Sequence, residues 1–140
     1  MNQTRTIQVI TLEMANYIAD KAIEKAIEIK LNICVWIVDP SGNPVVFKRQ
    51  DNSPLISIDT ARKKAMTAVG FGLPTGQTWH DFIKDDPILS GGIPQMKDFI
   101  LLGGGAPIII DGSMAGAIGI SGGHYKQDEQ CLSFALSFVK

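Results

Sequence analysis

The sequence has few of the residues that mark disulfide and metal sites. Its 140 residues include 2 cysteines and 2 histidines. Cys34 and Cys131 lie in apolar segments with neither a CxxC nor a zinc-ligand spacing, so we predict two buried thiols in a reducing compartment. The alternative is a disulfide between Cys34 and Cys131. No GK[ST] sequence occurs, which excludes a P-loop.

Strong charge and long apolar runs are also absent. The 13 basic and 14 acidic residues give a net charge of −1, which argues against nucleic acid and acidic membrane surfaces as partners. No apolar run approaches the roughly 20 residues that cross a bilayer, and the first residues lack the apolar core of a signal peptide. We expect a cytoplasmic protein. With 45% hydrophobic residues, the chain can form one core and still present apolar surface to another subunit.

The first half of the chain predicts a helix, a hairpin and a second helix. Thr11 is suited to cap a helix whose apolar residues recur at three- and four-residue steps to about Lys30. Two short apolar segments, 34–38 and 44–49, flank a turn with proline and glycine at 39–43, which predicts a hairpin. Ser57 or Asp59 is expected to cap a helix that ends near Gly70 or Gly72.

The second half predicts a short helical segment, three strands and a final helix. The helical segment lies within GQTWHDFIKDD, and the strands cover 99–102, 107–110 and 115–121. Asp111-Gly112 is a strong hairpin signal, and the last helix is expected from about Gln127 to Val139. The prediction is a single α+β domain over residues 1–140 with a five-stranded, mainly antiparallel sheet flanked by helices.

The glycine-rich segments allow several functional interpretations. Residues 119–123 match a GxSxG nucleophile elbow, but the one later histidine, His124, stands three residues after Ser121, which disfavours a hydrolase triad. The amides of Gly122 and Gly123 can hold an anion at a helix start, or Asp128 and Glu129 can cap them internally. Ile108 replaces the third glycine of a dinucleotide fingerprint after Gly103.

Two imidazoles are available as strong haem or metal ligands. His80 lies beside Trp79 and Phe82, and aromatic neighbours suit a flat porphyrin. His124 lies beside Tyr125 at the glycine turn. The surroundings of both residues are also typical of ordinary surface histidines. The methionines at 14, 66 and 96 could ligate iron but are typical of core positions. Lys64 belongs to a short basic run that is either a solvated helix face or a partner for an acidic ligand group.

Three stretches of the sequence together resemble a known family. They are DPSGNPVVF at 39–47, SIDTARKKAMTAVGFG at 57–72, and residues 99–129 with GGGAPIIIDGSMAGAIGISGG followed by QDE. In this order they resemble the GlcG/HbpS-like family, also called the haem-degrading domain, which includes the C-terminal domain of PduO-type corrinoid adenosyltransferases. Lys64 and the turns at 103–107 and 121–129 match the family's motifs.

The resemblance implies a profilin-like fold, a homo-oligomer, and binding of haem or, less readily, a corrinoid. It also implies an association with enzymes of glycolate, glycerol or propanediol utilisation. The chain departs from haem-binding relatives in having no histidine before His80.

We predict a small accessory domain that binds haem, a related tetrapyrrole or another small anionic ligand. The absence of a complete catalytic constellation disfavours an enzyme. The alternative is a non-catalytic assembly or stabilising subunit of a metabolic enzyme system, with no cofactor. His80 and His124 are the candidate metal ligands, and the candidate cofactor-binding residues are Lys64, His80, Gly103, Gly104, Gly105, Ser121, Gly122, Gly123 and His124.

Overall fold

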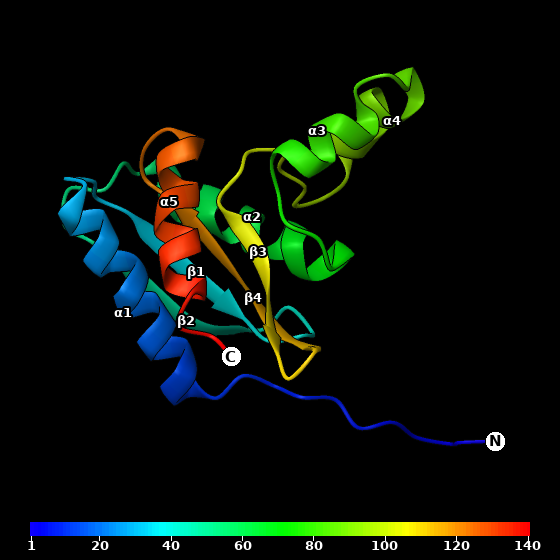
Figure 1. Cartoon of the computed structure of the whole chain (residues 1–140). Helices are drawn as coiled ribbons and strands as arrows, with labels where there is room; N and C mark the ends of the chain where they lie inside the picture. The colour runs from blue at the N-terminus through cyan, green and yellow to red at the C-terminus, as the bar shows by residue number, and fades with distance from the viewer.

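A four-stranded antiparallel sheet forms the centre of the protein. The computed structural model describes residues 1–140. The strands are β1 (Cys34–Val38), β2 (Pro44–Arg49), β3 (Gly105–Ile110) and β4 (Ser113–Ser121), in the spatial order β2-β1-β4-β3. Helices α1 (Leu12–Glu28) and α5 (Tyr125–Leu136) pack together on one face, and α2 (Ile56–Phe71) packs on the other (Figure 1). The α+β class with an antiparallel sheet between helices is confirmed.

Both predicted hairpins are confirmed, and side chains of the turns explain them. The Asp39 carboxylate accepts hydrogen bonds from the amides of Ser41 and Asn43, each at 2.9 Å, which closes the β1–β2 turn. Asp111 and Gly112 both have positive φ angles, 50° and 78°, as a tight two-residue hairpin turn requires. The first helix also begins as predicted, because the Thr11 hydroxyl accepts from the Met14 amide at 3.1 Å.

The prediction of five strands is wrong, because residues 99–102 form a link and not a strand. The amide of Ile100 donates to the Thr67 hydroxyl at 3.0 Å instead of to a neighbouring strand. Phe99 is buried against Trp79 and Ile83. The segment is therefore apolar because it packs under a helix. The profilin-like description of the fold stays a prediction.

The start of α2 also differs from the prediction. The helix begins at Ile56 after Leu55, which has a helical conformation and no capping side chain. Asp59 lies one turn inside and pairs with Arg62 at 2.9 Å. The end of this helix is confirmed at Gly72, whose φ of 70° is the left-handed conformation of a helix end.

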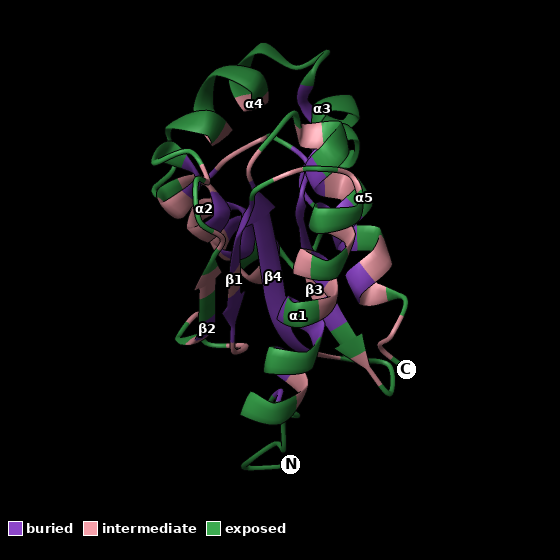
Figure 2. Ribbon diagram, turned by 90° about the vertical axis from the view of Figure 1, so that its left-hand side faces the viewer, coloured by how far each residue is buried: buried purple, intermediate pink, exposed green.

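The main core lies between the sheet and the α1–α5 layer. Figure 2 shows that burial is concentrated on β1 and β4, and β4 is buried from Ala115 to Ser121. Cys34 and Cys131 are buried free thiols, as predicted, and burial raises the pKa of Cys131 to about 11. None of the helices has the length and apolar character needed to cross a membrane.

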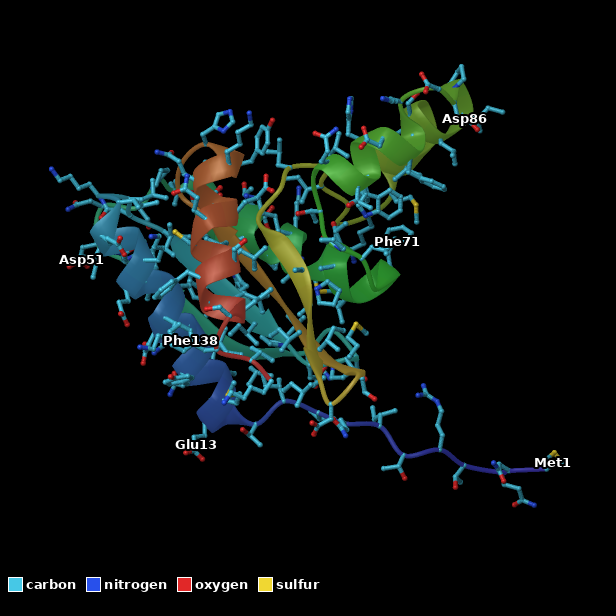
Figure 3. The ribbon with its side chains drawn as sticks, in the orientation of Figure 1. Met1, Glu13, Asp51, Phe71, Asp86 and Phe138 are labelled. Atoms are coloured by element: carbon cyan, nitrogen blue, oxygen red, sulfur yellow. The ribbon has the colours of Figure 1, made fainter.

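A helical projection leaves the body of the fold between α2 and β3. It contains α3 (Gln77–Ile83), α4 (Pro87–Gly92) and the 3-10 turn at Ile93–Gln95 (Figure 1). Trp79 and Ile83 of α3 attach it to Phe99 in a small separate core. Figure 3 shows Phe71 at the base of the projection and Asp86 at its far end. The projection is thus attached to the body at its base and extends away from it toward Asp86.

Candidate functional site

A cavity of about 300 Å³ lies where the projection meets the body of the protein. Its walls come from three segments that are far apart in the sequence: the start of α3, the link before β3 and the first residue of α5. The lining residues are Gly76, Gln77, His80, Leu101, Leu102, Gly103 and Tyr125. Two of the predicted site residues, His80 and Gly103, therefore line one cavity.

His80 reaches the cavity because its neighbour Trp79 fixes the orientation of α3. Trp79 is 4% exposed, and its ring packs edge-on against Phe71 and Phe99 with centroids 4.6 and 5.4 Å apart. Since successive residues of a helix point in different directions, burial of Trp79 leaves His80 exposed. The imidazole of His80 is thus held at the cavity wall by a rigid aromatic anchor.

His124 lies next to the cavity and has a structural task of its own. It is the N-cap of α5, and its Nδ1 accepts a hydrogen bond from the Lys126 amide at 3.1 Å. The Gln127 side chain in return accepts from the His124 amide at 3.0 Å. The ring stacks on Tyr125 with centroids 4.4 Å apart. Nε2 is therefore the one ring nitrogen of His124 that is not already committed to the cap.

Lys64 is buried behind the cavity and paired inside the protein. It is 1% exposed, and its ammonium donates to the Asp128 carboxylate at 2.9 Å and to the carbonyl of Ile120 at 2.8 Å. Burial lowers the pKa of Lys64 and raises the pKa of Asp128, and the attraction between the two charges opposes both shifts. The pair joins α2, β4 and α5, so it holds the elements around the cavity in place.

The three glycines at 103–105 have different roles. Gly103 lines the cavity. Gly104 has a φ of 121° and lies so close to Lys64 Nζ and the Ile120 carbonyl that a Cβ atom would collide with them. Gly105 packs in the same way against the backbone of Lys64. Gly104 and Gly105 therefore serve the close packing around the buried lysine.

The turn before α5 satisfies its amides internally. The Gly123 amide donates to the Asp128 carboxylate at 3.1 Å, and the Gly122 amide is also directed at it. Of the two interpretations of this turn, the structure therefore has internal capping, by Asp128 and not by Glu129. The buried Ser121 hydroxyl donates a hydrogen bond to the Ser57 hydroxyl at 3.4 Å and forms no hydrogen bond with His80 or His124.

Several lining residues were not singled out from the sequence. Gln77 and the two leucines lack any motif, and they line one cavity with Tyr125 only through the folded arrangement of α3, the link before β3 and α5. One signal was available for Tyr125. It stands inside the turn-and-helix motif at 121–129, four residues before Glu129, and this spacing places the side chains of Tyr125 and Glu129 on one helix face.

Comparison with known proteins gives a consistent family assignment. The model of a family described as haem degrading protein HbpS-like matches residues 10–137. A 15.0 kDa protein from the dhaT-dhaS intergenic region of Citrobacter freundii is 32% identical over 137 residues, 97% of this chain and 96% of that protein.

Two further similar proteins have names that refer to a corrinoid or to haem. The corrinoid adenosyltransferase PduO of Salmonella typhimurium is 31% identical over 119 residues, 84% of this chain, but the match spans 35% of that enzyme. The crystal structure of a PduOC:haem complex superposes with a TM-score of 0.85 at 28% identity, covering 92% of this chain and 94% of that one.

Proposed function

Because the chain belongs to the HbpS-like family of haem-degrading proteins, we propose that it binds haem or a related tetrapyrrole in the cavity between α3 and α5. The observation that carries the proposal is that His80 and Tyr125 line the same cavity from separate elements. In this role residues 1–140 act as one accessory domain without a catalytic constellation of its own. A corrinoid is the second tetrapyrrole to consider.

The residues of the cavity fit a haem group. Imidazole and phenolate groups both ligate haem iron, and His80 and Tyr125 offer one of each. Leu101 and Leu102 supply apolar surface for a flat macrocycle. A volume of about 300 Å³ is at the small end for ligand pockets, so a porphyrin would extend beyond the cavity. We propose His80 as the axial ligand, with His124, which stacks on Tyr125, as the alternative.

The other predicted site residues take a supporting part in this proposal. Gly103 forms the cavity wall, whereas Lys64, Gly104 and Gly105 hold the link and the strand behind it. Ser121, Gly122 and Gly123 position the start of α5, and with it Tyr125. Contact of these supporting residues with a ligand stays a prediction.

A hemin titration of the purified protein tests the proposal. We expect a saturable Soret band in the wild-type protein at near-equimolar hemin. Removing an axial ligand deletes a metal–ligand bond, so His80→Ala should weaken binding about tenfold or more and shift the band. His124→Ala tests the alternative ligand and also removes the N-cap of α5; it should keep the wild-type spectrum. A flat wild-type titration would rule the haem proposal out, and a loss in His124→Ala alone would transfer the axial role to that residue.

A second candidate function is supported by the surface of the projection. Phe82, Ile88 and Met96 are 63%, 84% and 52% exposed, which is a concentration of apolar side chains on one small unit. We propose that this surface contacts another subunit, either a copy of the chain or a metabolic enzyme of glycolate, glycerol or propanediol utilisation. Light scattering and co-purification test this role, and a strict monomer that retains no partner would exclude it.

A further inference from the structure

The carboxylate of Glu129 lies against two glycines of the cavity wall, Gly103 and Gly76. Glu129 is one helical turn after Tyr125, on the same face of α5, and is half-buried. Its Oε1 packs against Gly103, where a Cβ atom would overlap it, and lies 3.9 Å from the place of a Cβ on Gly76. Both glycines line the cavity. The absence of side chains at these two positions thus leaves room for the carboxylate.

The Glu129 carboxylate has no ion-pair partner of its own in the protein. The nearby ammonium of Lys64 is already bonded to Asp128 at 2.9 Å and to the Ile120 carbonyl. One ammonium therefore stands against two carboxylates in this part of the molecule, which leaves a surplus negative charge beside the cavity.

We propose that Glu129 determines the charge specificity of the cavity. An ionised carboxylate accepts hydrogen bonds and donates none, so it binds a ligand group that is cationic or donates protons, and it repels an anionic one. The inference rests on the proposed function in that it concerns the same cavity. For a tetrapyrrole it means that the anionic propionates lie away from the wall formed by Gly76 and Gly103.

Two small aromatic probes of opposite charge test this inference. Benzamidine and benzoate have the same ring, and they differ in presenting a cationic donor or an anionic acceptor. We expect the wild-type protein to bind benzamidine more tightly, as measured by calorimetry or ligand-observed NMR. Glu129→Gln removes the negative charge and nearly keeps the shape of the side chain, so it should reduce the preference about tenfold.

A control variant separates the local effect from the general charge of the protein. Glu28→Gln removes an equal charge from the exposed end of α1 and should leave the preference unchanged. The ratio of the two affinities is the readout, because a structural disturbance by Glu129→Gln would weaken both probes alike. Equal binding of the probes to the wild-type protein, no binding of benzamidine, or an unchanged ratio in Glu129→Gln would each overturn the inference.

The outcomes also separate the two proposals. If hemin does not bind while the preference for benzamidine depends on Glu129, the haem proposal fails and the charge specificity stands. If hemin binds through His80 while the probes show no preference, the charge specificity fails and the haem proposal stands.

Discussion

Lys64→Met is expected to lower the free energy of unfolding by about 3–5 kcal/mol, because it leaves the Asp128 carboxylate buried without its cation. Both side chains of this pair are almost fully buried, at 1% and 2% exposure. Methionine has nearly the length of the lysine stem, so the change removes the charge more than the packing. Urea unfolding at an unchanged m value would measure the loss.

The double variant Lys64→Met/Asp128→Asn is the control for the first prediction. Asparagine carries no charge, yet its carbonyl oxygen can still accept from the Gly123 amide as Asp128 does. The double variant should therefore unfold at a smaller cost than Lys64→Met alone, which is coupling between neighbours. If the double variant instead lost as much free energy of unfolding as the two single substitutions added together, the ion pair would not be what holds α2 and α5 together.

The stability of the single variant Lys64→Met should also depend on pH, in a defined direction. Burial raises the pKa of Asp128 in the folded protein, and Lys64 counteracts that rise. Without Lys64, the pKa of Asp128 in the folded protein lies further above its value in the unfolded protein. The fold therefore keeps its stability below the unfolded pKa and loses stability as the pH rises through the folded pKa. The deficit of Lys64→Met should thus be larger at neutral pH than at acidic pH.

Gly119→Ala is the second variant with a large expected effect. Gly119 is in β4, and an added Cβ atom would overlap the carbonyl oxygen of Ala61 and the amide nitrogen of Ala65 in α2. Both are backbone atoms, so the helix itself has to move away from the sheet. Overpacking of this kind costs about 1–3 kcal/mol and more where the neighbour is rigid, and we expect at least about 2 kcal/mol.

Gly70→Ala, in the α2 helix that packs on Gly119, provides a matched control. Its Cβ would meet no atom within 4 Å, and Gly70 lies in the last turns of α2 without a positive φ. Alanine favours a helix over glycine by up to about 1 kcal/mol, so this variant should be as stable as the wild-type protein or slightly more stable. A Gly119→Ala protein with wild-type stability would contradict the close approach of α2 to β4.

Local chemistry explains which elements were predictable from the sequence. The turns at Asp39–Asn43 and Asp111-Gly112 specify their own conformations, so both hairpins were predicted correctly. The segment at 99–102 is a short apolar run, and such runs do not distinguish a strand from a link that packs under a helix. Its true role depends on Trp79, twenty residues earlier, which no local pattern reveals.

The candidate site was predictable in part for the same reason. His80 and Gly103 stand out because imidazoles are scarce and the glycine run is unusual, and both line the cavity. Tyr125 and Gln77 join them through the position of the projection relative to α5. Lys64 was noted as part of a basic run, but its pairing with Asp128 spans 64 residues and requires the folded sheet.

The most direct test of the central claim is to locate bound hemin by NMR on the isotope-labelled wild-type protein. Paramagnetic iron broadens nearby amide signals. The account predicts that signals of Gly76–His80, Leu101–Gly103 and Tyr125 disappear, while those of the Asp111-Gly112 turn remain. Broadening centred on any other surface, or no broadening at all, would contradict a haem site between α3 and α5.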